Sequence, residues 1–438
     1  MSKISKKIRI NPQSIIIYVL LILCLLGCNT VYSTCVTRDY KFPELTTFFL
    51  LVLVMMNIKY LSYSIITNWF LIFIPYYLLN FIIIFFSVSS DKIISYSVRF
   101  LLFVPFLVLV ILNDARRKNI WNIALKFENL VICYASISLV LWILVCILNV
   151  VPATGQIVSS WGGEKTYPIY FGIFTTRQTQ EFMGRVWIRN QGFFAEGPMY
   201  NLVLIIAVCI EAFIAPLNRK KGKYIWNGMD LRKIVILVIA DISTFTITGM
   251  ILLVGICAFK YCLMPSKSAL IGVIKWIGAI VVLILALYTV NNLFLIKADT
   301  GSWEVRFDDF IAGYKAWKHS IWFGNGYGTM DTITHYMSSR RSYNMGYSSG
   351  IFSILAQGGI ALFINYLVGF GGYIRYSLKN HKYELIAMLI IIILILATSI
   401  FHYTFVMLLF LAYGYSLLFN RTLTMRKNRL DGINGSKK

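Results

Sequence analysis

Long apolar stretches recur along the chain and are separated by short polar or charged segments. A bilayer core about 30 Å thick requires roughly 20 apolar residues in a helix, so each such stretch predicts one membrane span. The two stretches that meet at Thr248 and Gly249 are both short, and the alternative is one long helix followed by a re-entrant piece. The twelve predicted spans centre on residues 14–30, 43–58, 64–87, 94–112, 129–150, 198–217, 233–248, 249–265, 270–295, 350–374, 383–401 and 402–420.

Composition agrees with a protein of many spans. Of the 438 residues, 58% are hydrophobic and 13% are charged, whereas globular domains are about 45 to 50% apolar and about 25% charged. The net charge of +23 would suggest nucleic acid in a soluble chain, but most of these cations fall on one side of the predicted spans. Lysines and arginines in the connections between spans hold the side on which they lie in the cytoplasm. We therefore predict an all-α polytopic membrane protein, residues 1–438 forming one domain, with both termini cytoplasmic and no nucleic acid partner.

The first thirty residues allow a second interpretation. A basic start, an apolar run and the sequence ending at Cys28 imitate a lipoprotein signal. Because eleven further spans follow, an uncleaved first helix is the simpler interpretation.

Two predicted outer segments are much longer than the other connections, at residues 151–197 and residues 296–349. Long connections on one face commonly carry chemistry or recognition. No P-loop is present in the sequence, so nothing indicates that the protein is driven by ATP on the cytoplasmic side.

The first outer segment ends with arginines and a glutamate that lead directly into a span. Arg185 and Arg189 precede Glu196, and Pro198 suits the first turn of the next helix. One interpretation makes Glu196 a cap at the positive end of that helix, with the arginines as solvated partners. The other makes the arginines a phosphate clamp, because guanidinium binds phosphate oxygens in pairs. Glu196 would then orient the arginines or act as a base.

The second outer segment begins with an amphipathic pattern. Phe307, Phe310 and Tyr314 follow helical spacing, which predicts a helix over about residues 303–320 that lies along the outer membrane interface. Arg306 stands near the edge of this apolar stripe, where an arginine either reaches a headgroup phosphate or snorkels to water.

Two acids and three glycines in this segment invite other interpretations. Asp308 and Asp309 are adjacent, but neighbouring helical positions point about 100° apart, and no other acid follows at useful spacing. We therefore expect no metal and no cofactor. Without a preceding strand, the alternating Gly324, Gly326 and Gly328 predict a tight turn rather than a dinucleotide-binding motif.

Other polar residues are candidates for proton transfer or substrate binding. Histidine is the usual proton acceptor near neutral pH, which makes His335 a candidate base, although loop histidines are commonly just solvated. An acid inside a span is costly and usually faces a polar cavity, so Asp241 is expected to line one. The remaining candidates for substrate binding in the second outer segment are Arg340, Arg341, Tyr343 and Asn344.

Residues of both outer segments form two ordered motifs. The first has an arginine, a glycine three residues later, an aromatic, a glutamate and a proline: Arg189, Gly192, Phe194, Glu196 and Pro198. The second has an arginine upstream of a tryptophan, then alternating aromatics and glycines: Arg306, Trp317, Phe323, Gly324, Gly326, Tyr327 and Gly328. In these motifs the chain resembles the bacterial O-antigen polymerase and O-antigen ligase superfamily, membrane glycosyltransferases of the GT-C type. Gly197 departs from the pattern, because family glutamates and prolines are commonly adjacent.

The resemblance implies a polymerase at the outer face of the bacterial inner membrane. Such an enzyme joins undecaprenyl-diphosphate-linked oligosaccharide repeat units into O-antigen or capsular polysaccharide, alongside membrane lipids, a chain-length regulator and a flippase. Arg189 and Arg306 would stabilise the leaving diphosphate without a metal, and Arg185, Arg340 or Arg341 would assist. Glu196 or His335 would accept the proton of the attacking sugar hydroxyl.

Two alternatives remain open from the sequence. Ligases of the superfamily usually carry a histidine followed by an asparagine before the next span, whereas Tyr343 and Asn344 occupy that place here, which favours a polymerase. A flippase or transporter would explain Asp241. That class predicts charged residues on several mid-membrane helices, whereas most charges here lie in loops.

Overall fold

The computed structural model describes residues 11–117, 119–182, 184–218, 229–266, 268–295, 302–341 and 346–419. The fold is 70% helical, and helices form in each of the twelve ranges predicted as spans. Among the described residues, five helices are long and apolar enough to cross a membrane: Tyr63–Ser87, Ser90–Arg116, Asn122–Ile147, Gly197–Asn218 and Gly350–Asn380. Length and composition thus support a membrane protein, while the count of twelve spans and a GT-C fold stay predictions.

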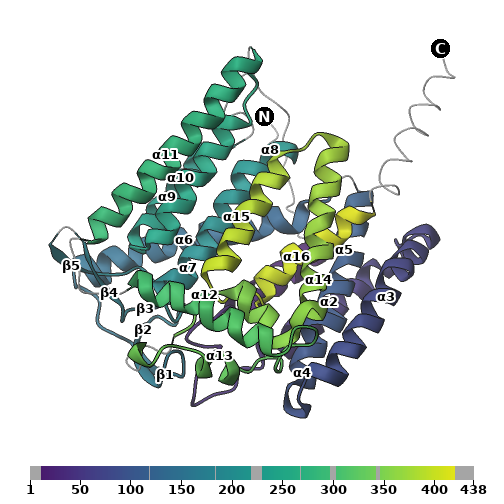
Figure 1. The fold of residues 1–438 in the computed structure, drawn as a ribbon, viewed down its shortest axis with the longest axis horizontal. Helices are drawn as coiled ribbons and strands as arrows, with labels where there is room; N and C mark the ends of the chain where they lie inside the picture. The colour runs from purple at the N-terminus through teal and green to yellow at the C-terminus, as the bar shows by residue number, and fades with distance from the viewer. Residues whose placement is uncertain are drawn as a thin grey trace, which may run out of the picture.

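The helices follow one another along the chain with few long connections (Figure 1). They are α1 (Pro12–Leu26), α2 (Phe42–Ile58), α3 (Tyr63–Ser87), η1 (Ser90–Lys92), α4 (Ile93–Tyr96), η2 (Ser97–Phe103), α5 (Val104–Arg116), α6 (Asn122–Trp142), η3 (Ile143–Ile147), α7 (Gly197–Cys209), η4 (Ile210–Ile214), α8 (Ala215–Asn218), α9 (Leu231–Ser243), α10 (Ile247–Cys262), α11 (Ala269–Leu295), α12 (Ser302–His319), α13 (Asp331–His335), η5 (Ser339–Arg341), α14 (Gly350–Asn380), α15 (Glu384–Thr398) and α16 (Phe405–Leu418). The main apolar core lies between these helices, with α16 almost wholly buried.

Segments predicted on the same side of the membrane contact one another. On the outer side, the Asn190 Nδ2 donates to the Ser243 Oγ (2.9 Å), and the Tyr327 amide donates to the Ser87 carbonyl (2.7 Å). On the other side, the Arg117 Nη1 donates to Gln13 (2.9 Å). The strands, α12 and α13 gather at one end of the molecule, at the lower left in Figure 1. Which end faces the cytoplasm stays a prediction, and both termini lie outside the described residues.

The first outer segment contains strands, so the all-α prediction is wrong for this part of the chain. An antiparallel sheet is formed by β1 (Gly155–Ser159), β2 (Lys165–Tyr170) and β3 (Phe174–Thr175), and a hairpin by β4 (Thr179–Phe182) and β5 (Arg185–Ile188). Ile157, Tyr167 and Ile169 are buried with Val31 and Ala195, while their neighbours along each strand are more exposed. This alternation of period two is typical of a sheet covered on one face.

The chain turns between α9 and α10, a few residues before the predicted meeting point at Thr248 and Gly249. Phe245 adopts a left-handed conformation, with φ of +49°. The Thr244 hydroxyl donates to the Asp241 carbonyl (2.7 Å), which satisfies a group at the end of α9. The result is two separate helices, of which α9, with 13 residues, is about 20 Å long and shorter than the bilayer core.

Helix α14 is broken at Gly359, whose φ of +61° and ψ of −164° are not helical. The loop after α12 fills the break, because the Asn325 amide donates to the Ala356 carbonyl (2.7 Å) and the Ile360 amide donates to the Ile321 carbonyl (2.9 Å). A side chain at Gly324 would strike the backbone of Gln357. The glycine-rich turn predicted from the sequence thus forms, and it inserts into the break in α14.

The crossing of α14 and α16 allows a matched test of packing. A Cβ added to Gly372 would clash with the carbonyl oxygen of Gly414, whereas a Cβ on Gly371 meets nothing within 4 Å. We expect Gly372→Ala to lower the unfolding free energy by about 1 to 3 kcal/mol. Gly371→Ala is expected to raise it by about 0.5 to 1 kcal/mol, because alanine loses less backbone entropy in a helix. Unfolding in detergent micelles measures both, and equal effects of the two substitutions would refute the close crossing.

Candidate functional site

Arg189 lies between β5 and α7, where two elements hold its side chain. The guanidinium Nη2 donates to the Gln180 Oε1 (2.5 Å) on β4 and to the Phe245 carbonyl (3.3 Å) in the α9–α10 turn. Its Nε is buried without a described partner. The aliphatic part packs on Gly197, where an added Cβ would stand 3.3 Å from the Arg189 Cδ. Arg189 is therefore preorganised and retains unused hydrogen-bonding capacity.

Glu196 occupies the N-cap position of α7, yet its side chain makes no capping hydrogen bond. The nearby donors are already used: the Gly197 amide donates to the Gln178 Oε1 (2.9 Å), Pro198 has no N–H, and the Met199 amide donates to the Glu196 carbonyl (3.2 Å). Glu196 therefore stands at the start of α7, as the capping interpretation expects, but its side chain makes no capping hydrogen bond.

The Glu196 carboxylate lies among an indole and two cations. Burial raises the pKa of Glu196 above its usual range, while a hydrogen bond from Trp161 and the positive charges of Lys165 and Arg189 oppose that rise. Burial also lowers the pKa of Arg189, and the charge of Glu196 opposes this change. An arginine nevertheless stays protonated at biological pH. A carboxylate and a permanent cation thus lie within electrostatic reach of each other.

Arg306 projects from α12 towards the end of α15. Its Nη1 donates to the Thr398 carbonyl (3.5 Å), and its side chain is partly buried. Burial lowers the pKa of Arg306, with the charge of Asp309 opposing. Arg306 thus lies at the end of the molecule where the strands gather (Figure 1), and it is not simply solvated.

Asn29 connects the neighbourhoods of Glu196 and Arg306. Its carbonyl accepts a hydrogen bond from the Ala195 amide (3.1 Å), and its Nδ2 donates to the Ile400 carbonyl (3.3 Å). Asn29 is in the left-handed region, with φ of +51°, a conformation that asparagine tolerates well. One residue therefore holds the start of α7 next to the end of α15, two residues beyond the carbonyl that Arg306 contacts.

Arg341 is buried in ion pairs. Its Nη1 lies 2.6 Å from the Asp309 Oδ1 and 3.0 Å from the Asp308 Oδ2, and its Nη2 donates to the Gly346 carbonyl (2.6 Å). The other Asp309 oxygen accepts from the Ser348 amide (3.0 Å). The adjacent acids therefore neutralise an arginine, and Arg341 organises the loop after α12 instead of facing an open surface.

The other predicted residues are dispersed. Arg185 is exposed next to the turn of the β4–β5 hairpin, and His335 is exposed at the end of α13. The side chain of Arg340 lies outside the described part, and Tyr343 and Asn344 lie outside the described residues. Their predicted roles in catalysis and binding stay predictions.

Asp241 is fully buried near the end of α9. The Asn201 Nδ2 on α7 donates to its Oδ1, and its Oδ2 has no described partner. Gly249 leaves room for Asn201, because an added Cβ would overlap that amide. Asp241 thus joins α7 to α9. It precedes by four residues Phe245, whose carbonyl accepts a hydrogen bond from Arg189.

Sequence patterns did not identify the supporting residues of this site. Asn29 stands at the end of an apolar run. Lys165 and Gln180 belong to strands that were not predicted, and Trp161 lies in the turn between two of them. Only the expectation that residues 151–197 carry function pointed to the last three.

No family model matches the chain, and no curated protein sequence matches it. Function is therefore inferred from the residues and the geometry of the site. The site contains the guanidinium of Arg189, which two hydrogen bonds hold in place, the Glu196 carboxylate, which makes no capping hydrogen bond, and Arg306. The arginines are able to bind an anionic group, and the carboxylate is able to accept a proton.

Proposed function

We propose that the protein is a membrane glycosyltransferase that joins undecaprenyl-diphosphate-linked repeat units into O-antigen or capsular polysaccharide. The observation that carries the proposal is that Glu196, which makes no capping hydrogen bond, lies within electrostatic reach of the positioned Arg189. The order of the two arginine motifs in the sequence supports the same reaction class. We place the reaction at the outer face of the bacterial inner membrane.

In the proposed reaction, a sugar hydroxyl of one lipid-linked unit attacks the anomeric carbon of the growing chain. A carbon–oxygen bond forms, and the bond from the anomeric carbon to the diphosphate oxygen breaks. Glu196 accepts the hydroxyl proton, while Arg189 and Arg306 stabilise the negative charge that develops on undecaprenyl diphosphate. Because arginine carries a fixed positive charge, it can stabilise this leaving group directly.

The outward surface of α12 supports a substrate that carries a lipid. The face packed on α14 contains Asp309, Ala312 and Ala316, and the aromatic residues Phe307 and Tyr314 are exposed on the other side. An exposed aromatic stripe of this kind suits the membrane interface. Arg306 on the same helix would then meet the diphosphate where the lipid enters the headgroup layer.

A gel of surface polysaccharide from cells lacking the gene separates the candidate functions. Loss of a polymerase leaves a single repeat unit on the carrier or the core. Full-length chains left on the lipid carrier would instead indicate a ligase, and loss of all outward-facing units would indicate a flippase. Either of these two results would contradict the proposal.

The pH dependence of polymerisation tests Glu196 as the base. Only the ionised carboxylate accepts a proton, so activity should rise with pH through the pKa of Glu196, which burial holds above its usual range. Lys165→Met removes a cation that lowers this pKa, so the acid limb should move to higher pH. Arg177→Met is the matched control, because Arg177 lies over the Tyr167 ring (5.4 Å) and should leave the limb unchanged. An acid limb that is identical in wild type and Lys165→Met would argue against Glu196.

A further inference from the structure

A cavity of about 340 Å³ lies where α1 and α6 begin and α5 ends. Because α6 continues through η3 to β1, the cavity is at the end of the molecule opposite the strands. Its charged lining residues are Asp114, Arg117 and Lys126. Pockets that hold small ligands commonly measure about 300 to 1,000 Å³. Nothing in the proposed glycosyl transfer uses this cavity.

The two cations of the cavity are held in place by the first turn of α1. The Arg117 Nη1 donates to the Gln13 Oε1 (2.9 Å), and the Lys126 Nζ donates to the Ser14 Oγ. Guanidinium and ammonium groups each carry more N–H groups than these hydrogen bonds use. Both cations therefore keep donors for a ligand in the cavity.

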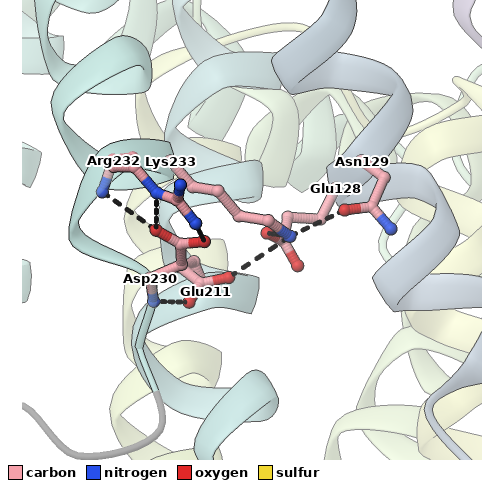
Figure 2. Close-up of polar contacts among 6 residues, drawn as sticks. All are labelled: Glu128, Asn129, Glu211, Asp230, Arg232 and Lys233. Atoms are coloured by element: carbon pink, nitrogen blue, oxygen red, sulfur yellow. Dashed lines mark hydrogen bonds and ion pairs between the residues drawn. The ribbon is translucent and has the colours of Figure 1, made fainter.

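The lining is positively charged, since two cations and one acid leave a net charge of +1. The next acid along α6, Glu128, faces α9 instead, and its Oε1 lies 2.8 Å from the Lys233 Nζ (Figure 2). The flanking sequence adds no further acid, because residues 1–13 and 115–127 contain neither aspartate nor glutamate. A ligand with a single negative charge would neutralise the lining.

The cavity also offers hydrogen-bond acceptors. The Asp114 side chain accepts from the Asn122 Nδ2 at its Oδ2 (2.9 Å) and is buried, and a carboxylate has room for further donors. Asn119 also lines the cavity, and its Oδ1 is buried without a donor among the described residues. A buried acceptor without a donor is costly. A ligand that carries hydroxyl groups next to its negative charge would satisfy both side chains.

An apolar surface continues from the cavity along α1. Ser14 lines the cavity, and Tyr18 and Ile22 follow at intervals of four residues, which places them on the same face of the helix. Ile22 is 42% exposed, and the Lys126 Nζ lies over the Tyr18 ring (5.5 Å). Tyrosine is common where the membrane meets water. This surface suits an acyl chain, which a free phosphate ester lacks.

We propose that the cavity binds the headgroup of an anionic phospholipid of the phosphatidylglycerol class. Arg117 and Lys126 donate to the phosphate oxygens, while Asp114 and Asn119 accept from the glycerol hydroxyls. An acyl chain lies along the exposed face of α1. Basic pockets between membrane helices commonly bind anionic headgroups in this way. The bound lipid joins α1, α5 and α6 at this end of the molecule.

Native mass spectrometry of the purified full-length protein tests the site. The protein in detergent micelles would be titrated with phosphatidylglycerol, and the dissociation constant of the first bound lipid would be measured. Arg117→Gln and Lys126→Gln should each weaken this binding about 5-fold or more. Arg116→Gln is the matched control, because the neighbouring Arg116 is exposed and donates to the Tyr60 carbonyl instead. It should bind the lipid like wild type.

Other ligands test the headgroup in the wild-type protein without any substitution. Phosphatidylmethanol keeps the phosphodiester charge but lacks the hydroxyls, so it should bind about 5-fold or more weakly, and Asp114→Asn should narrow this difference. Phosphatidylcholine, which has no net charge, should bind more weakly still. Glycerol phosphate lacks acyl chains and should not displace phosphatidylglycerol at equal concentration.

Four results would overturn the proposal. They are equal wild-type affinities for phosphatidylglycerol and phosphatidylcholine, equal affinities for phosphatidylglycerol and phosphatidylmethanol, unchanged binding in the Arg117→Gln and Lys126→Gln proteins, and displacement by glycerol phosphate at equal concentration. The last result would assign the cavity to a soluble phosphate ester. Because lipid binding does not require polymerisation, the site can stand or fall independently of the proposed enzyme activity.

Discussion

Replacement of Arg189 by alanine is expected to lower the rate of polymerisation about 10²- to 10³-fold, the usual loss when one preorganised donor to a developing negative charge is removed. The guanidinium is fixed by Gln180 and the Phe245 carbonyl, so its charge is in place before the diphosphate departs. The rate would be measured as chain growth on lipid-linked repeat units by purified protein in vesicles.

Two further substitutions control this experiment. Arg189→Lys keeps the charge but loses the planar fork, so it should recover only part of the activity. Arg185→Ala removes an exposed arginine of the neighbouring hairpin that is predicted only to assist, so the rate should fall much less than in Arg189→Ala. A rate in Arg185→Ala as low as in Arg189→Ala would show that the segment works by general positive charge and not through one positioned residue.

Arg341→Ala is expected to destabilise the protein by about 3 to 5 kcal/mol, because it leaves buried carboxylates without a countercharge. The Arg341 and Asp309 side chains are 4% and 1% exposed. The loop between α12 and α14 should lose its order, and activity should fall with the folded fraction. Thermal unfolding in detergent, monitored together with activity, measures both effects.

The companion variant for Arg341 is Asp308→Asn, since Asp308 is 18% exposed and Arg341 keeps its contact with Asp309. This variant should cost much less stability than Arg341→Ala. If Arg341→Ala instead unfolded like wild type while activity was lost, Arg341 would belong to the substrate site, as its position in the sequence first suggested.

Apolar patterning predicted the positions of the helices well, because a run of about 20 apolar residues has one common solution in a bilayer. It did not predict the strands of residues 155–188, whose runs are only two to six residues long. It also did not predict the break in α14, since Gly359 is needed only because the Trp322 backbone passes there. Contacts between distant segments leave no local signal.

The same limit applies to the candidate site. Arg189, Glu196 and Arg306 were identified because their order follows a known motif. The burial of Arg341 depends on Asp309, 32 residues away along the chain, and a loop arginine in the sequence looks the same whether it is paired or free. Asn29 was overlooked for a related reason, because its role depends on a segment 371 residues further along the chain.

The most direct test of the proposed function is chain growth in a purified system. Wild-type protein would be placed in vesicles with the undecaprenyl-diphosphate-linked repeat unit of its own organism, and products would be separated by length. We expect a ladder of lengthened chains with release of undecaprenyl diphosphate, and far less of both products from Arg189→Ala or Glu196→Gln protein that unfolds like wild type. A wild-type protein that forms no ladder and only moves the lipid-linked unit across the membrane, or passes it to an acceptor, would contradict the proposal.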